Sequence, residues 1–353
     1  MKALVLSGGT GTRLRPLTYS TPKQLLPAAN KPILFHIIEK IARAGIHDIG
    51  IIVGDTRMEV MAAAGDGQRW GVDITYIHQP IPLGLAHAVK MAAGFLGGDS
   101  FLMILGDNLF QMELNGFLSE FEENKANASL LLVPMDDPAG FGVASVKDGR
   151  ITYLVEKPDR PESNLVVTGI YLFDKSIFRA IDMITPSWRN ELEITDAIQK
   201  MIQMGRTVTY KQMAGWWKDT GNPAALLEAS RFLLDEPGES SGNLCVHDSV
   251  LTGKVLVEGP IQIENSIIRG PVILGAHTAI TDSCVGPYVS AEEGVCIRNC
   301  TVEDSILLKG AVLERFSARI QKSIIGKYTS VRGAETNSKA ACLVLGDNSS
   351  LVL

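Results

Sequence analysis

The sequence predicts an α/β domain built on a mostly parallel sheet, followed by a β-solenoid. Short apolar strands alternate with amphipathic helices up to about residue 234, a charged, turn-rich stretch follows at Asp235–Gly242, and beyond it an apolar residue recurs every six positions. The chain has 353 residues, of which 46% are hydrophobic and 20% charged, so it can bury a sizeable core and lacks the composition of a disordered chain. The predicted domains are residues 1–235 and 244–353, joined by a linker at 236–243.

In the first domain, short apolar runs predict strands at Ala3–Leu6, Ile49–Val53, Ile74–Ile77 and Phe101–Leu105. Amphipathic stretches predict helices at Ile33–Ala44, Leu85–Phe95 and Leu114–Asn124. Strands that alternate with helices pair in parallel, and the helices cover both faces of the sheet. Ligands bind such sheets at the carboxyl ends of the strands, so we expect the site in the loops that follow these strands.

In the second domain, the six-residue recurrence predicts short strands that each send one side chain inward before a turn. The row comprises Val255, Ile261, Ile267, Ile273, Ala279, Val285, Ala291 and Ile297, and continues in a second phase at Ile306, Val312, Ala318 and Ile324 and in the tail at Leu345 and Leu351. This stretch resembles the left-handed parallel β-helix of hexapeptide-repeat proteins.

Composition and charge disfavour several classes of partner. The formal net charge is −6, which disfavours a polybasic nucleic-acid binder. No uncharged apolar stretch approaches the roughly 20 residues that span a bilayer, and the apolar opening stops at Gly8 without a cleavage site, so we expect a cytoplasmic protein with no membrane partner. The five cysteines include no Cys-x-x-Cys pair, and we expect reduced thiols.

A glycine-rich turn with the sequence LSGGTGTRLRP follows the first predicted strand. The first 38 residues contain five basic residues and no Asp or Glu, so an anion is expected to dock there. Glycine backbone N–H groups can approach a polyphosphate, and Arg13 and Lys23 would neutralise its charge. The turn lacks the Gly-Lys-Ser/Thr of a P-loop, and Leu14 stands where a dinucleotide fingerprint requires glycine. The sequence therefore predicts a phosphate site of another kind.

The run GGTGTRLRPLTYSTPKQLLPAANKP closely resembles the opening motif of the sugar-1-phosphate nucleotidylyltransferases, and among them the long glucose-1-phosphate thymidylyltransferases with a β-helix tail. Further stretches follow in family order: QPIPLGLAHAV, LGDN, FGVA, VEKP, VTGIY, RNELEITD and WKDTG. The resemblance implies a Rossmann-like nucleotidyltransferase sheet. It also implies transfer of a nucleotidyl group from dTTP to glucose 1-phosphate, giving dTDP-glucose and pyrophosphate.

The resemblance implies a set of nucleotide-binding residues: Leu6, Gly8, Gly9, Gly11, Thr12, Arg13, Gln79, Pro82, Gly84 and Asp107. In this reading Arg13 stabilises charge on the leaving phosphates and Lys23 contacts the α-phosphate. Gln79 and Gly84 would face the base, because an amide pairs with an imide edge and a glycine allows close approach. Asp107 and Asp219 are assigned to Mg²⁺, a hard cation that prefers oxygen ligands.

The resemblance also implies a sugar-phosphate site formed by Gly142, Glu156, Lys157, Thr168, Tyr171 and Arg189. Lys157 and Arg189 would contact the phosphate, the latter because a guanidinium matches phosphate oxygens in a bidentate manner, and Glu156 would receive sugar hydroxyls. The catalytic residues implied are thus Arg13, Lys23, Lys157 and Arg189. Asn190 departs from the glycine that related sequences usually carry.

Two alternatives to this function stay open. Thymine and uracil share the imide edge, so the same chemistry with UTP or GTP and another sugar 1-phosphate fits the residues. A catalytically silent regulatory subunit would be marked by loss of Arg13, Lys23, Asp107, Lys157 or Asp219, and all are present.

The attacking phosphate oxygen is already ionised and needs no general base, so packing is the expected role of His87. In the β-helix, His277 stands alone, and homo-oligomerisation rather than acyl transfer is the expected role of that domain.

Overall fold

The computed structural model of the protein describes residues 1–333 and 340–352; the last residue of the predicted second domain, Leu353, lies outside them. The contacts divide the chain into two compact units, the first comprising Met1–Thr10 and Ile33–Asp219 and the second Gly11–Pro32 and Thr220–Leu353. We call Gly11–Pro32 the signature segment, because it carries most of the basic motif. The signature segment thus groups with the β-helix, whereas the sequence analysis assigned it to residues 1–235.

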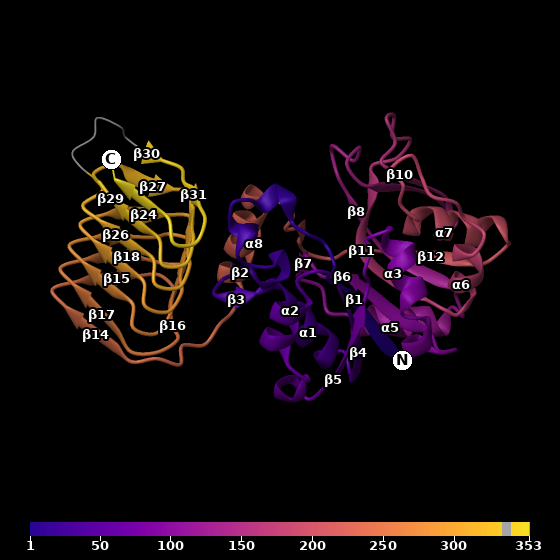
Figure 1. Ribbon diagram of the computed structural model, residues 1–353, viewed down its shortest axis with the longest axis horizontal. Helices are drawn as coiled ribbons and strands as arrows, with labels where there is room; N and C mark the ends of the chain where they lie inside the picture. Colours follow the sequence, from indigo (N-terminus) through magenta and orange to yellow (C-terminus); the bar gives the residue numbers. More distant parts are fainter. Residues whose placement is uncertain (334–339, 353) are drawn as a thin grey trace. The chain divides into compact units, whose positions relative to one another are not determined.

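The first unit is built on one mixed sheet with the strand order β5-β4-β1-β6-β11-β8-β12-β10-β9 (Figure 1). Its strands are β1 (Lys2–Leu6), β4 (Asp48–Val53), β5 (Asp73–His78), β6 (Phe101–Leu105), β8 (Ala128–Pro134), β9 (Gly142–Lys147), β10 (Arg150–Glu156), β11 (Leu165–Phe173) and β12 (Val208–Gln212). Strands β5, β4, β1 and β6 pair in parallel, which confirms the four predicted strands and their arrangement.

The second half of this sheet contains antiparallel pairs, which the alternation of strands and helices did not predict. Strand β11 runs antiparallel to both β6 and β8, and β9 and β10 form a hairpin. The hairpin loop is Asp148-Gly149, with φ of +50° and +74°. A two-residue loop with both φ angles positive matches the twist of the flanking strands, so it folds the chain straight back and leaves no room for a crossover helix.

Helices flank this sheet: α1 (Ile33–Arg43), α2 (Arg57–Ala64), α3 (Leu85–Met91), α4 (Ala93–Leu96), α5 (Asn115–Glu123), α6 (Ser176–Ile181) and α7 (Ile194–Gln203), with a short 3₁₀ turn η4 (Gln68–Trp70). The predicted helices at Ile33–Ala44 and Leu114–Asn124 match α1 and α5. The third predicted helix is divided into α3 and α4 at Ala92, whose ψ of 0° departs from helical geometry. Among the described helices, none combines the length and hydropathy needed to span a membrane.

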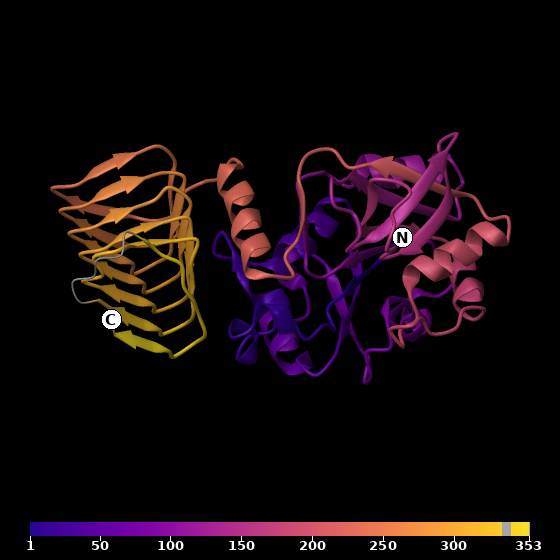
Figure 2. The same cartoon turned by 90° about the horizontal axis from the view of Figure 1, so that it is seen from above.

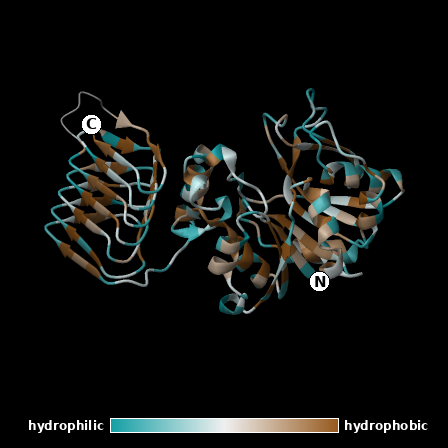
Figure 3. Cartoon of the chain, in the orientation of Figure 1, coloured by the Kyte–Doolittle hydropathy of each residue, from teal (hydrophilic) through white to brown (hydrophobic). Residues whose placement is uncertain are grey.

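The second unit contains a β-helix whose strands stack as three parallel sheets (Figures 1 and 2). The first sheet comprises β14 (Leu244–His247), β17 (Ile261–Glu264), β20 (Ala279–Thr281), β23 (Cys296–Arg298), β26 (Val312–Glu314), β29 (Ser330–Arg332) and β32 (Ser350–Val352). The second comprises β15 (Val250–Thr252), β18 (Ile267–Arg269), β21 (Cys284–Val285), β24 (Thr301–Glu303), β27 (Arg319–Gln321) and β30 (Ala340–Ala341). The third comprises β16 (Val255–Val257), β19 (Val272–Leu274), β22 (Val289–Ala291), β25 (Ser305–Leu307), β28 (Ile324–Ile325) and β31 (Val344–Leu345). In this β-helix, hydrophobic residues are concentrated in the strands and hydrophilic residues in the turns (Figure 3).

The period of the β-helix corrects the predicted six-residue row. Backbone N–H groups of Ser283 and Cys300 donate to the hydroxyls of Ser266 and Ser283, and each bond joins residues 17 apart. The coils that these bonds join are therefore one residue shorter than three hexads, and a strict six-residue row drifts out of phase there. Ile261, Val285, Ala291 and Ile297 are buried in the core as predicted, whereas Ile267 is 42% exposed.

In these 17-residue coils the chain turns sharply at the corner between the first and second sheets. Asn265 and Asp282 turn the chain there with φ of +46° and +50°. Asn and Asp tolerate this left-handed conformation, so a single residue makes the turn. Consequently Ile263 and Ile268, only five positions apart, both enter the core.

The signature segment and helix α8 (Pro223–Asp235) complete the second unit. The segment consists of short 3₁₀ turns and a small hairpin: η1 (Thr12–Leu14), η2 (Leu17–Tyr19), η3 (Lys23–Leu25), β2 (Pro27–Ala28) and β3 (Lys31–Pro32). Helix α8 begins after Asn222, whose side chain accepts a hydrogen bond from Ala225 N at 3.0 Å. Arg231 on this helix pairs with Asp304 of the β-helix, so α8 is fixed to the coils by a charge pair.

Candidate active site

The loops at the carboxyl ends of β1 and β5 bring predicted nucleotide-binding residues together in the first unit. Leu6 O accepts a hydrogen bond from Gly106 N at 2.8 Å, which ties the end of β1 to the end of β6. A Cβ atom on Gly8 would lie 3.4 Å from Gln79 Oε1, so the glycine-rich turn passes directly beside the Gln79 amide. Gly8 and Gln79 are thus neighbours, although they are distant in the chain.

The Gln79 side chain is held in one orientation. Its amide Nε2 lies 2.9 Å from His87 Nδ1 and donates to Gly84 O at 3.4 Å. Gly84 has φ +104°, and a Cβ atom there would lie 2.5 Å from Leu192 O. The loop that contains Gln79, Pro82 and Gly84 therefore needs a glycine at position 84 for both its backbone conformation and its close packing.

The basic residues of the motif lie in the signature segment. Gly11 has φ +66°, and a Cβ atom there would lie 2.9 Å from Lys23 Cβ. Thr18 Oγ1 donates to Gly11 O at 2.7 Å, which closes the segment on itself. Arg13 lies in η1, exposed to solvent, one residue after Thr12. Arg13 and Lys23 thus belong to the second unit, while Gly9 lies at the edge of the first.

The two carboxylates assigned to the metal lie on one small ribbon of the first unit. Strand β13 (Trp217–Asp219) pairs antiparallel with β7 (Asn108–Phe110), which sets Asp219 opposite Asn108. Asn108 Nδ2 donates to Asp107 Oδ1 at 2.9 Å, and Trp217 Nε1 donates to Asn108 Oδ1 at 2.8 Å. Asp107 directly precedes β7, so it adjoins the residue that lies opposite Asp219 in this ribbon.

This donor set fits Mg²⁺ better than a metal that requires an all-protein cage. Within the described residues, no group of three His, Cys, Asp or Glu side chains is arranged to hold an ion. Mg²⁺ is commonly bound by one or two carboxylates together with substrate phosphates and water, so a pair of carboxylates suffices.

The predicted sugar-phosphate residues form a charged cluster around Glu156. Glu156 Oε1 lies 3.9 Å from Lys157 Nζ and 3.7 Å from Arg189 Nη1, and Thr195 Oγ1 donates to Glu156 Oε2 at 3.2 Å. A Cβ atom on Gly142 would lie 3.3 Å from that same oxygen. Burial raises the pKa of Glu156, and its neighbours Lys157, Thr195 and Arg189 oppose this shift only in part.

Arg189 is carried by a tight turn. Asn190 N donates to Ser187 O at 2.9 Å, and Asn190 adopts φ +59°, the left-handed conformation that a glycine would supply at this position. Asn190 can therefore stand at this position where related sequences usually carry glycine. The Arg189 guanidinium also contacts Glu193 at 3.3 Å and Glu191 at 3.2 Å, so carboxylates surround it where a phosphate would bind.

Two predicted sugar contacts lie within the core beside this cluster. Thr168 is fully buried, and its hydroxyl donates to Leu131 O at 2.9 Å. Tyr171 is 3% exposed and stacks on Phe173, with ring centroids 5.7 Å apart, and burial raises the pKa of its hydroxyl. Thr168 thus has a structural partner in β8 and Tyr171 has one in β11, and their contact with a sugar stays a prediction.

Comparison with known proteins agrees with this architecture. The family model described as nucleotidyl transferase matches residues 2–236. This chain belongs to the nucleotidyl transferase family. It is 47% identical over 350 residues to a glucose-1-phosphate thymidylyltransferase of Streptomyces griseus, covering 99% of this chain and 98% of the relative.

Two further relatives cover different shares of the chain. The low-salt glycan biosynthesis nucleotidyltransferase Agl11 of Haloferax volcanii is 40% identical over 358 residues, with both chains fully covered. A Bacillus anthracis structure, assigned as a glucose-1-phosphate thymidylyltransferase and solved in complex with a sucrose, has 39% identity and a TM-score of 0.64. It matches over 98% of its own length but covers 68% of this chain. Members of the family thus occur both with and without a long C-terminal region.

Some residues of the nucleotidyl transferase site were not assigned from the sequence. His87 was expected only to pack, but from helix α3 it contacts the Gln79 amide in the loop that precedes the helix. Thr195 and Glu193 lie inside the quoted motif RNELEITD, yet only Arg189 of that motif received a role. Arg189 and Glu193 lie before helix α7, so no helical spacing pointed to their ion pair. The bond from Thr195 to Glu156 joins residues 39 apart and leaves no local trace.

Proposed function

We propose that this protein transfers a nucleotidyl group from dTTP to glucose 1-phosphate, giving dTDP-glucose and pyrophosphate. The proposal is supported by the similarity to a thymidylyltransferase over 99% of the chain. The observation that carries it is the cluster in which Glu156 lies between the cations Lys157 and Arg189. A carboxylate for sugar hydroxyls beside two cations for a phosphate is the set that a sugar phosphate requires.

In the reaction, an oxygen of the sugar phosphate attacks the α-phosphorus of the nucleotide, and the bond from that phosphorus to the bridging oxygen breaks. The β- and γ-phosphates leave as pyrophosphate, and no proton transfer is required. Lys157 and Arg189 would hold the attacking phosphate and reduce its repulsion with the nucleotide. Arg13 would stabilise the charge on the leaving group and Lys23 the α-phosphate, because cations fixed in advance cost no reorganisation.

Mg²⁺ is the metal proposed for Asp107 and Asp219. When bound, it would supply positive charge to the phosphate oxygens. The ribbon of β7 and β13 would keep the two carboxylates in place, since Trp217 and Asn108 link its strands by hydrogen bonds. A reaction that consumes a nucleoside triphosphate and a sugar phosphate is in keeping with the cytoplasmic location expected from the sequence.

The first test is the initial rate of pyrophosphate release with Mg²⁺ and glucose 1-phosphate, comparing dTTP, UTP, GTP, ATP and CTP. We expect the highest kcat/KM with dTTP. Preference for another nucleotide would leave the mechanism in place and replace the assigned substrate. We also expect Asp107→Ala and Asp219→Ala to abolish turnover while the variants remain folded by circular dichroism, and wild-type rates in either variant would overturn the metal assignment.

A homo-oligomer formed through the β-helix is proposed as well. Val250 and Ile267 lie side by side on adjacent coils and are 56% and 42% exposed. Exposed apolar residues stacked along a flat sheet favour contact with another copy. Light scattering after size-exclusion chromatography should show more than one copy, and Ile267→Arg should shift the protein toward the monomer.

A further inference from the structure

The signature segment has little regular structure of its own. Apart from a hairpin with two residues in each strand, it consists of 3₁₀ turns of three residues each. Such short turns form few backbone hydrogen bonds and are not stable in isolation. The position of Arg13 and Lys23 therefore depends on contacts that the segment makes with the rest of its unit.

The first set of such contacts is with the last coils of the β-helix. Ser20 Oγ donates to Asp347 Oδ2 at 2.8 Å, and Lys327 Nζ donates to Thr21 Oγ1 at 3.3 Å. The two β-helix residues are joined to each other, because Lys327 N donates to Asp347 Oδ1 at 2.7 Å. Thr21 is only 6% exposed and lies two positions before Lys23, so the contact is made next to a predicted catalytic residue.

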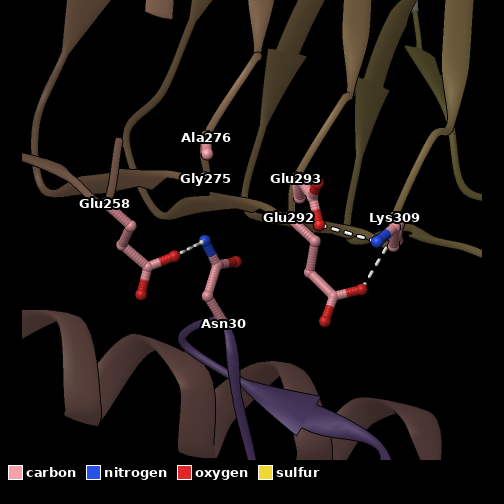
Figure 4. A pocket seen from close by; sticks show the side chains of 7 residues that line it. All are labelled: Asn30, Glu258, Gly275, Ala276, Glu292, Glu293 and Lys309. Carbon is pink, nitrogen blue, oxygen red and sulfur yellow. Dashed lines mark hydrogen bonds and ion pairs between the residues drawn. The ribbon is translucent and has the colours of Figure 1, made fainter. Parts of the chain in front are cut away.

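A second set of contacts anchors the hairpin at the end of the segment (Figure 4). Asn30 Nδ2 donates to Glu258 Oε2 at 2.9 Å and to Ala291 O at 2.8 Å, and the same figure shows Asn30 pointing from the hairpin toward Glu258. A cavity of about 280 Å³ adjoins this contact and is lined also by Glu292 and Lys309. The segment is therefore attached to the β-helix at two places, through Asn30 and through Ser20 and Thr21.

Two attachments to a stiff body fix the segment between them. The strands of the β-helix are joined in parallel ladders along each sheet, so each coil is held to its neighbours by backbone hydrogen bonds. Supporting residues hold a catalytic group precisely only when they are themselves fixed in this way. The charge-assisted bonds of Asp347 meet that requirement, because one carboxylate joins the segment and the coil.

We propose that Lys327 and Asp347 are positioning residues for the nucleotide, which hold the signature segment so that Arg13 and Lys23 are correctly placed. The β-helix thus contributes to turnover without touching a substrate. This inference rests on the proposed function, since it takes from it the roles of Arg13 and Lys23. It adds a role for the second domain beyond oligomer formation.

The test uses the full-length protein and the variants Asp347→Ala, Lys327→Met and Ser20→Ala. Glu303→Ala is the matched control, because Glu303 is a β-helix carboxylate whose ion pair, to Arg319 at 3.3 Å, lies entirely within the β-helix. Kinetic constants are measured for each substrate separately, together with the melting temperature. A displacement of about 1 Å can lower a rate up to a hundredfold, so we expect a loss of about tenfold in kcat/KM for the nucleotide.

The kinetic constants distinguish a positioning role from a simple loss of folded protein. Loss of folded protein lowers kcat but changes neither KM, whereas the proposal predicts a higher KM for the nucleotide and an unchanged KM for the sugar phosphate. Ser20→Ala should add little to Asp347→Ala, because both remove the same bond. The proposal is overturned if Asp347→Ala behaves like Glu303→Ala. Arg13→Ala is assayed in parallel. If Arg13→Ala is active, the proposed role of the signature segment in the reaction is overturned. If Arg13→Ala is inactive and Asp347→Ala is fully active, only the positioning role of the β-helix is overturned.

Discussion

Replacement of Gly84 by alanine tests whether the nucleotide loop depends on close packing. Gly84 has φ +104° and ψ 171°, a conformation almost confined to glycine, and a non-glycine residue there costs on the order of 1–3 kcal/mol. The added Cβ atom would also lie 2.5 Å from Leu192 O and 2.7 Å from Leu192 N, so the backbone has to move. Overpacking of this kind costs about 1–3 kcal/mol, so the expected loss in the free energy of unfolding is about 4 kcal/mol.

Gly97→Ala is the matched control for this variant. Gly97 has φ +66° and ψ −135°, also a conformation that disfavours alanine, but a Cβ atom there would meet nothing within 4 Å. The Gly97→Ala variant should therefore lose only about 1–3 kcal/mol of its free energy of unfolding, from the strained backbone alone. The difference between the two variants measures the contact with Leu192.

The assay is urea unfolding of both variants, followed by KM for the nucleotide. Gly84 O accepts a bond from the Gln79 amide, so movement of this backbone should raise the nucleotide KM in Gly84→Ala and leave it unchanged in Gly97→Ala. Equal stability losses in the two variants would refute the packing argument, and an unchanged KM would refute the link to Gln79.

Three further predictions concern the site and its supports. Trp217→Phe should lower the free energy of unfolding by about 2 kcal/mol, because the buried indole N–H donates to Asn108 Oδ1 and Thr168 O. Urea titration measures this, and an unchanged midpoint of urea unfolding would contradict it. Burial raises the pKa of Glu156, so the charged form of this carboxyl destabilises the folded protein. Glu156→Gln should therefore lose turnover but melt higher than wild type at pH 7.5, and this advantage should shrink as the pH falls and be gone at the ordinary Glu pKa of about 4.5. A lower melting temperature at pH 7.5 would show the sign to be wrong. Arg189→Lys should raise KM for the sugar phosphate about tenfold, since an ammonium cannot replace bidentate contacts; a rise in the nucleotide KM alone would place Arg189 elsewhere.

Local patterns in the sequence determined much of the architecture. Apolar runs located β1, β4, β5 and β6, because a buried parallel strand needs a short continuous apolar stretch and little else. The recurrence of apolar residues revealed the β-helix, since each coil repeats the same local requirement. The ordered motifs identified most of the residues of the candidate site, because binding of phosphates and metals requires particular residue types at the ends of strands.

Only the tertiary structure decided how these parts are phased and joined. The 17-residue coil depends on a one-residue corner at Asn265, and the recurrence alone does not reveal how many residues a corner takes. The contact of His87 with Gln79, the position of Asp219 opposite Asn108 and the attachment of Ser20 to Asp347 are set by packing between segments far apart in the chain. Such pairings leave no periodic trace, because the free energy that selects them comes from the folded whole and not from neighbouring residues.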